Sequence, residues 1–125
     1  MGDWDDTTTV SKSLLLVDKP QRVLKASLQQ VEGAESPRVI NLTEPLYVIG
    51  RSKHADLPFE CELLSRKHCE LRCGESGFSF TDMNSKNGVY LNGIKCHSSL
   101  LHDGDMLQIG TVALIFKKTS EIGKD

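Results

Sequence analysis

Three polar clusters between Gly50 and Gly93 carry side chains that can donate hydrogen bonds to an anion. They are Gly50-Arg51, the run Ser-Arg-Lys-His at 65–68, and the run Asn-Ser-Lys-Asn-Gly at 84–88. A guanidinium offers a planar pair of donors to a phosphate, and hydroxyls, amides and backbone N–H groups in turns add neutral donors. No cluster pairs a nucleophile with an obvious base, so we predict no catalytic residues. The pattern predicts loops that meet and hold a phosphate carried by another protein.

The composition is that of one ordinary globular domain. The 125 residues are 38% hydrophobic and 26% charged, with a formal net charge of −2, and a chain of this length can form a core without disulfides. This charge favours neither nucleic acid nor a membrane as a partner, and no apolar run approaches the ~18 residues of a membrane span. Four cysteines without a secretory signal predict reduced thiols in a nuclear or cytoplasmic protein.

The elements around these clusters read as short β-strands. Apolar and polar residues alternate in short runs bounded by turn residues, and no window keeps a helical period. Asn92-Gly93 predicts a two-residue hairpin turn, because both central positions of a type I′ turn need a positive φ. The pattern is typical of an all-β sandwich or barrel. The predicted strands are 23–31, 38–42, 46–50, 57–59, 68–73, 77–82, 88–93, 106–110 and 111–117.

The three clusters, with fourteen positions between Arg51 and Ser65, closely resemble the forkhead-associated (FHA) domain signature. The resemblance covers about residues 24–118. It implies an eleven-stranded β-sandwich whose loops at one end recognise phosphothreonine peptides. The positions expected to bind are Arg51 and Ser65 on the phosphate, Arg66 assisting, Asn87 on the ligand main chain, and Lys86 at a contacting position. Those expected to shape the loops are Gly50, His68 and Gly88.

Two positions depart from the family pattern. Val89 stands where threonine commonly follows the Asn-Gly pair, and we expect a difference in packing rather than a loss of binding. Lys86 stands where some members have a hydroxyl residue, which predicts a change in ligand selectivity. We divide the chain into an N-terminal extension at 1–21, the FHA domain at 22–118 and the start of a C-terminal tail or linker at 119–125.

Metal and cofactor sites are not expected. His68, Cys69 and Cys73 could suggest zinc, but on one strand the two cysteines would lie about 13 Å apart, too far for one ion. We therefore predict that His68 is a buried, hydrogen-bonded side chain that braces the loops. No nucleotide-binding or hydrolase motif occurs, so no cofactor and no enzymatic activity are predicted.

The N-terminal extension allows two further hypotheses besides a solvated acidic tail. Thr7, Thr8 or Thr9 could be phosphorylated and dock into the same site of a second molecule, giving a phosphorylation-dependent homodimer. Alternatively, the apolar run at 13–18, Ser-Leu-Leu-Leu-Val-Asp, could form an edge strand that pairs across a two-fold axis without phosphate.

The sequence thus predicts a non-enzymatic phosphothreonine-binding module for phosphorylation-dependent protein–protein interaction. Family resemblance suggests nuclear signalling or the DNA damage response, as in the N-terminal domain of a checkpoint mediator-type scaffold. The alternative is a structural dimerisation module that uses its extension and has a secondary or lost phosphopeptide site.

Overall fold

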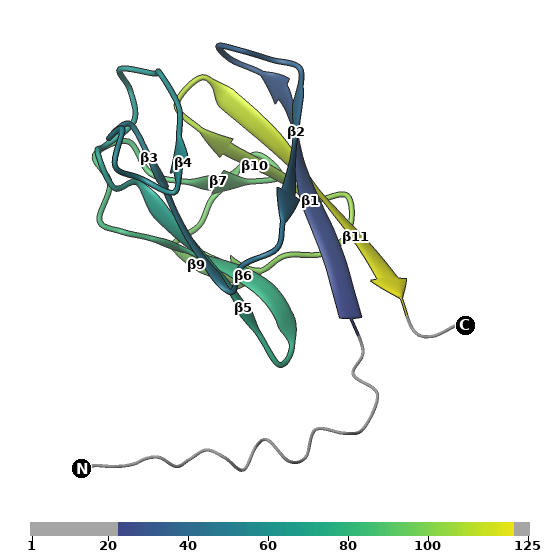
Figure 1. The fold of residues 1–125 in the computed structure, drawn as a ribbon. Coiled ribbons are helices and arrows are strands. Elements are labelled where there is room, and N and C mark those ends of the chain that lie inside the picture. Colours follow the sequence, from purple (N-terminus) through teal and green to yellow (C-terminus); the bar gives the residue numbers. More distant parts are fainter. Residues whose placement is uncertain (1–22, 122–125) are drawn as a thin grey trace, which may run out of the picture.

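The computed structural model describes residues 23–121, which form eleven strands and no helix (Figure 1). The predictions for Thr7, Thr8 and Thr9 and for the apolar run 13–18 fall outside these residues. The strands are β1 (Val23–Glu32), β2 (Arg38–Leu42), β3 (Leu46–Gly50), β4 (Leu57–Pro58), β5 (Cys69–Gly74), β6 (Gly77–Asp82), β7 (Tyr90–Leu91), β8 (Ile94–Lys95), β9 (Ser98–Leu100), β10 (Met106–Ile109) and β11 (Val112–Glu121).

The strands form two sheets that pack as a sandwich. One sheet has six strands in the order β2-β1-β11-β10-β7-β8, and the other has five in the order β4-β3-β5-β6-β9. Every strand pair is antiparallel except β3–β4, which is parallel. The predicted eleven-stranded all-β sandwich is confirmed.

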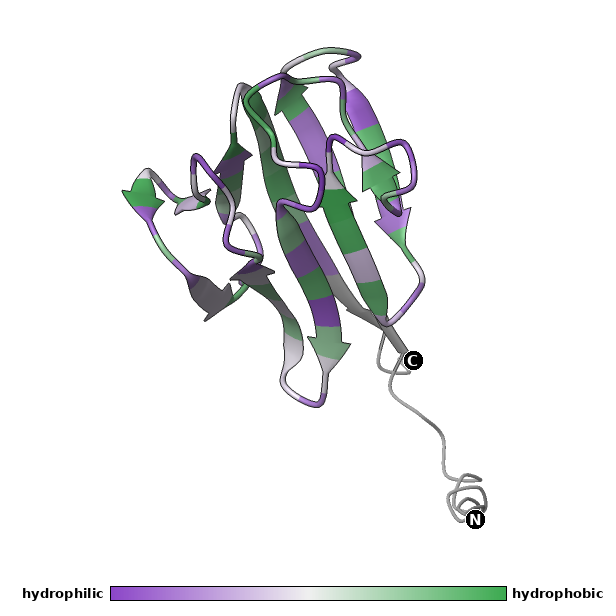
Figure 2. Cartoon of the chain, turned by 90° about the vertical axis from the view of Figure 1, so that its left-hand side faces the viewer, coloured by the Kyte–Doolittle hydropathy of each residue, from purple (hydrophilic) through white to green (hydrophobic). Residues whose placement is uncertain are grey.

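The alternation of residue types along the strands places the core between the sheets. Figure 2 shows hydrophobic and hydrophilic residues following one another along the strands. In β1, Ala26 and Leu28 are buried while Lys25 and Gln29 are exposed, as the period of two requires. Phe78 and Phe116 meet edge to face across the sandwich, with ring centroids 5.8 Å apart. Val89 is fully buried in the core, which agrees with the expected role in packing.

Several strands differ from the predicted ranges by one or more residues at their ends, and two larger differences have a clear reason. β11 continues through residues 119–121, which were assigned to the tail, because these residues pair with the first three residues of β1. β9 was not predicted, since Ser98–Leu100 has neither the length nor the alternation that marks a strand in a sequence. Within residues 23–121 there is no helix with the length and hydrophobicity needed to cross a bilayer.

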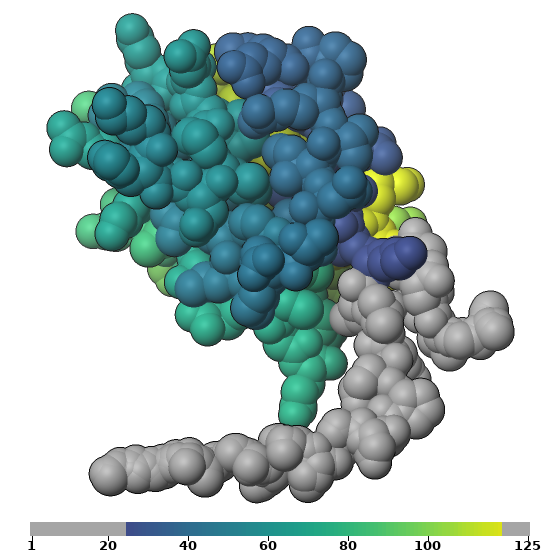
Figure 3. Space-filling model, viewed as in Figure 1, coloured from purple at the N-terminus to yellow at the C-terminus, as the bar shows by residue number. Residues whose placement is uncertain are grey.

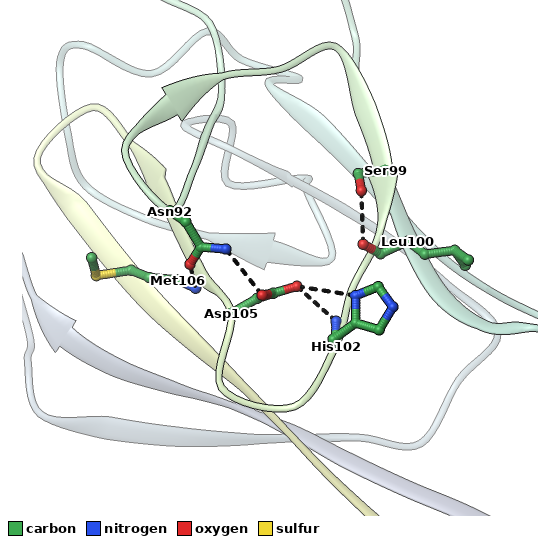
Figure 4. Close-up of polar contacts among 6 residues, drawn as sticks. All are labelled: Asn92, Ser99, Leu100, His102, Asp105 and Met106. Carbon is green, nitrogen blue, oxygen red and sulfur yellow. Dashed lines mark hydrogen bonds and ion pairs between the residues drawn. The ribbon is translucent and has the colours of Figure 1, made fainter.

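A polar cluster fastens the β7–β8 turn to the turn before β10 (Figure 4). Asn92 and Gly93 have φ angles of 51° and 88°, which confirms the predicted hairpin turn. The Asp105 carboxylate accepts a 3.0 Å bond from the Asn92 amide and a 2.7 Å bond from the His102 N–H. The Met106 N–H donates to Asn92 Oδ1 at 2.9 Å. These bonds hold the two turns in one arrangement.

Candidate functional site

The site begins where β3 ends, at Gly50. A Cβ built on Gly50 would overlap the Arg66 carbonyl oxygen and lie 2.6 Å from the carbonyl carbon. Only glycine therefore allows the loop before β5 to approach the end of β3 this closely. Gly50 thus contacts a backbone that follows sixteen residues later in the sequence, and its role in shaping the loops stays a prediction.

Backbone hydrogen bonds join the two loops on either side of Gly50. The Arg51 N–H donates to the Ser65 carbonyl at 3.0 Å, and the Ser52 N–H donates to the Arg66 carbonyl at 3.2 Å. The Arg51 Nε donates to the Leu64 carbonyl at 3.1 Å. These bonds bring the first and second polar clusters together despite the fourteen positions between Arg51 and Ser65.

The third cluster is tied to the second by its backbone and by a side-chain amide. The Lys86 N–H donates to Ser65 Oγ at 3.0 Å. The Asn87 Nδ2 donates to the Leu63 carbonyl at 2.7 Å. The loop between β6 and β7 therefore lies directly against the loop between β4 and β5.

Short-range bonds shape the third cluster itself. The Ser85 N–H donates to Asp82 Oδ1 at 3.0 Å, and the Gly88 N–H donates to Ser85 Oγ at 2.9 Å. Asn84 and Gly88 have positive φ angles of 59° and 82°, conformations that asparagine and glycine adopt most readily. The run Asn-Ser-Lys-Asn-Gly is therefore a tight turn that presents Lys86 and Asn87, which are both exposed.

His68 connects the second and third clusters from the interior of the protein. It is fully buried, its Nδ1 accepts a 3.0 Å bond from the Ser65 N–H, and its Nε2 lies 2.7 Å from the Gly88 carbonyl. Since a carbonyl can only accept, the bonding pattern requires the neutral tautomer with its hydrogen on Nε2. His68 is therefore buried and hydrogen-bonded as predicted, with one contact to each loop.

The three clusters surround one shallow depression of about 360 Å³. Two cations and one carboxylate lie on its wall, from Arg51, Lys86 and Glu62, so its charge is positive. Its lining residues are Arg51, Glu62, Leu63, Leu64, Ser65, Lys86 and Asn87.

Several polar groups in this depression keep unused hydrogen-bonding capacity. Among residues 23–121, the side chain of Arg51 makes one hydrogen bond, through Nε, and no ion pair, so its terminal nitrogens can donate to a ligand. Ser65 Oγ accepts from the Lys86 N–H, which leaves the hydroxyl hydrogen to donate. Asn87 uses one amide hydrogen, so its Oδ1 and second hydrogen can pair with a peptide backbone. The arrangement can hold an anion and an extended main chain side by side.

The expected site residues are not all placed in the depression. The depression is lined by Arg51, Ser65, Lys86 and Asn87. Arg66 is exposed and lies outside this lining. The structure uses the Arg66 backbone to join the loops, and the assisting role of its side chain stays a prediction.

Three lining residues had no sequence signal that pointed to them: the buried Leu64 and the exposed pair Glu62 and Leu63. Glu62 is an ordinary surface carboxylate in sequence, and Leu63 is part of a short apolar pair. Leu63 is 48% exposed, and its carbonyl holds Asn87. All three are in the depression because the loop before Ser65 folds over the third cluster.

The four cysteines are unpaired thiols. Burial raises the pKa of the Cys69 thiol to about 12, with a further increase from the nearby carboxylates of Asp82 and Glu70. Cys69 is therefore a neutral core side chain, which is the opposite of what metal ligation requires. Residues 23–121 contain no cluster of three or more histidine, cysteine or carboxylate groups suited to a metal.

Comparison with curated proteins finds bacterial relatives. The chain is 36% identical over 75 residues to an oxoglutarate dehydrogenase inhibitor of Corynebacterium efficiens, covering 60% of this chain and 53% of that protein. It is 32% identical over 84 residues to the glycogen accumulation regulator GarA of Mycobacterium tuberculosis, covering 67% and 52%. The chain thus spans about half the length of these relatives.

Solved structures show the same sandwich. One, from a structural and functional analysis of phosphothreonine-dependent FHA domain interactions, matches with a TM-score of 0.67 and 29% identity, covering 74% of this chain and 95% of that one. The FhaA FHA domain, complexed with the intracellular domain of Rv3910, matches with a TM-score of 0.65 and 27% identity, covering 76% and 100%.

The family model named FHA domain matches residues 47–110, just over half of the 125 residues. This match contains all three polar clusters and the residues around the depression. The chain belongs to the FHA domain family.

Proposed function

We propose that this FHA domain binds phosphothreonine-containing segments of other proteins, and so makes protein–protein interactions that depend on phosphorylation. The observation that carries the proposal is the meeting of Arg51, Ser65 and Asn87 at one depression, each with hydrogen-bonding capacity to spare. The module needs no catalytic group and no cofactor for this activity.

The chemistry of the ligand fits these groups. A phosphothreonine carries a charge of roughly −1.5 to −2 and three strong acceptor oxygens. The Arg51 guanidinium and the Ser65 hydroxyl donate to the phosphate, and Lys86 adds a positive charge. Asn87 pairs with the main chain just after the phosphothreonine. His68, Gly50 and Gly88 act indirectly, by keeping the three loops in contact.

The named relatives support a regulatory role through a protein partner. One is called an inhibitor of oxoglutarate dehydrogenase and another a regulator of glycogen accumulation, and the FhaA FHA domain was solved with an intracellular protein domain. We infer that this chain also acts on a protein partner in signalling. The curated relatives named above are bacterial, so they give no support to the expected nuclear location or checkpoint-mediator setting, whereas a cytoplasmic location is consistent with them.

Titration of three versions of one peptide tests the proposal. The versions carry phosphothreonine, phosphoserine or threonine, in a sequence chosen from a degenerate phosphopeptide library, and binding is measured by fluorescence anisotropy. We expect the phosphothreonine peptide to bind best and the unmodified one to bind at least about 100-fold more weakly, because two charge-assisted bonds are lost. Equal affinity for all three peptides would rule the proposal out.

The dimer hypotheses need residues outside 23–121 and stay predictions. They are the docking of phosphorylated Thr7, Thr8 or Thr9 into a second molecule, and the alternative structural dimer formed through the extension. Light-scattering mass measurements on phosphorylated and unmodified protein separate them, since the first gives a dimer only after phosphorylation. A monomer in both states would remove both hypotheses.

A further inference from the structure

A second hollow lies at the opposite ends of the same strands that carry the phosphate-binding loops. On the side of the depression, β3 ends at Gly50 and β6 ends at Asp82. On the other side, Pro45 precedes the start of β3, and Phe78 lies just after the β5–β6 turn. The hollow has a volume of about 780 Å³, larger than the depression, and we call it the lower groove. It is within the size range of sites that bind small molecules or side chains.

The lower groove has an apolar floor and a charged rim. Its apolar members are Ala26, Leu42, Pro45, Cys73 and Phe78, which come from both sheets. Lys25 and Glu44 are exposed beside them and give the rim one charge of each sign. Figure 3 shows the contributing segments together on the lower side of the molecule: the purple start of β1, the blue residues around β2 and β3, and the green β5–β6 hairpin.

The sequence just before β1 matches this surface in chemistry and in reach. Residues 14–17 are four consecutive apolar residues, Leu-Leu-Leu-Val, followed by one carboxylate at Asp18 and one ammonium at Lys19. Six positions separate Val17, the last residue of the apolar run, from Val23, where β1 begins, so the end of the run stays within about 20 Å of the strand. Lys25, the third residue of β1, is already part of the groove wall.

We propose that residues 14–17 of the same chain occupy the lower groove, with Asp18 and Lys19 facing the opposite charges of Lys25 and Glu44. The leucines cover the apolar floor, and the segment is anchored next to the strand that it precedes. The groove is thus a second binding site, for the chain's own N-terminal segment. Its occupation does not depend on phosphopeptide binding, so either proposal can fail without the other.

The thiol of Cys73 provides a direct measurement, because it lies in the groove wall and is only half-buried. The 125-residue protein is compared with a variant carrying Leu14→Ser, Leu15→Ser and Leu16→Ser. Alkylation of each cysteine by N-ethylmaleimide is followed by mass spectrometry. Cys96, also half-buried, is the internal control, since its N–H bonds to the Val89 carbonyl beside the phosphate-binding loops.

We expect Cys73 to react about tenfold faster in the triple variant. If the segment covers Cys73 in about nine molecules of ten, only the remaining tenth reacts in the native protein, and the variant exposes the thiol in all molecules. Cys96 should react at the same rate in both proteins. A matched variant with Thr7→Ser, Thr8→Ser and Thr9→Ser should leave both rates unchanged. Unchanged Cys73 reactivity, together with the absence of nuclear Overhauser contacts between the Leu14–Leu16 methyl groups and the Phe78 ring, would overturn the proposal.

Dilution tests whether the segment belongs to the same chain. Protection of Cys73 that is equal at about 5 µM and about 500 µM supports docking within one molecule, since an intramolecular contact does not depend on concentration. Protection that disappears on dilution would mean that the groove takes the segment of a second copy, and the proposal as stated would be wrong.

Discussion

Two polar clusters in this molecule are both held together by side-chain hydrogen bonds, and they differ in whether a cation keeps donors that have no partner. In the cluster around Asp105, the carboxylate accepts from Asn92 and His102, and Asn92 accepts from Met106, so its oxygens all have partners (Figure 4). In the phosphate-binding loops, side chains also bond to backbone, but in the described part of the chain Arg51 donates only through its Nε, and Ser65 Oγ accepts one bond and keeps its hydrogen. A cation whose terminal donors are free beside a depression, rather than polarity or turn geometry, distinguishes the binding site from the structural cluster.

Arg51→Ala should give the largest effect on binding. The variant loses the bidentate donor, and we expect phosphopeptide affinity to fall by at least about 100-fold, or about 2.7 kcal/mol. Anisotropy titration measures the loss, and circular dichroism should show an intact fold. Arg72→Ala is the matched control, because Arg72 is exposed on β5 and, within residues 23–121, pairs only with Glu70. An Arg51→Ala variant that binds as well as the native protein would place the phosphate elsewhere.

Gly50→Ala should affect stability and binding together. The added methyl group overlaps the Arg66 carbonyl, so the loops must separate, and we expect the free energy of unfolding to fall by about 2 kcal/mol. Urea denaturation measures this change. Gly74→Ala is the control, because a Cβ at Gly74 meets nothing within 4 Å. If both variants unfold at the same urea concentration, the close approach at Gly50 contributes nothing to stability.

Asn87→Ala should weaken binding less than Arg51→Ala does. The variant loses neutral bonds to the ligand main chain and the bond to the Leu63 carbonyl, and we expect about a tenfold loss of affinity. Titration with one phosphopeptide at constant salt measures it. Asn41→Ala, an exposed asparagine on β2, should bind normally. A loss as large as that of Arg51→Ala would mean that the Leu63 bond holds the whole site in shape.

Asp105→Asn should change stability alone. Partial burial acts to raise the pKa of Asp105, but the bonds from Asn92 and His102 outweigh it and lower that pKa below its ordinary value. A lowered folded-state pKa contributes stability above the ordinary value near 3.9, and this contribution is lost as the pH falls through the folded-state pKa. We therefore expect the variant to be less stable by about 1 kcal/mol at pH 7, with the difference shrinking below about pH 4.

Urea denaturation at several pH values measures that difference, and phosphopeptide affinity should stay within about twofold of native, because no residue of the cluster lines the phosphate-binding depression. A large loss of affinity in Asp105→Asn would contradict the distinction between the structural cluster around Asp105 and the phosphate-binding site.

The sequence by itself determined the strands that alternate regularly and the turns that need special backbone angles. β2, β3 and β6 begin and end where the sequence predicted, because turn residues bound each run, and in β6 the alternation of Phe78 and Phe80 with Ser79 and Thr81 also shows one buried face. Asn92-Gly93 was predictable for the same local reason, since few residues accept a positive φ. The likeness of the three clusters to one family also indicated Arg51, Ser65 and Asn87.

Only the tertiary structure decided how those clusters meet. Residues that are distant in the sequence come together in three places: Gly50 contacts the Arg66 backbone, Asn87 donates to the Leu63 carbonyl, and Glu62 lines the same depression as Arg51. The last residues of β11 are strand because β1 lies beside them, not because of their own pattern. Such features arise from packing between segments, and a local sequence pattern does not predict which segment will pack against it.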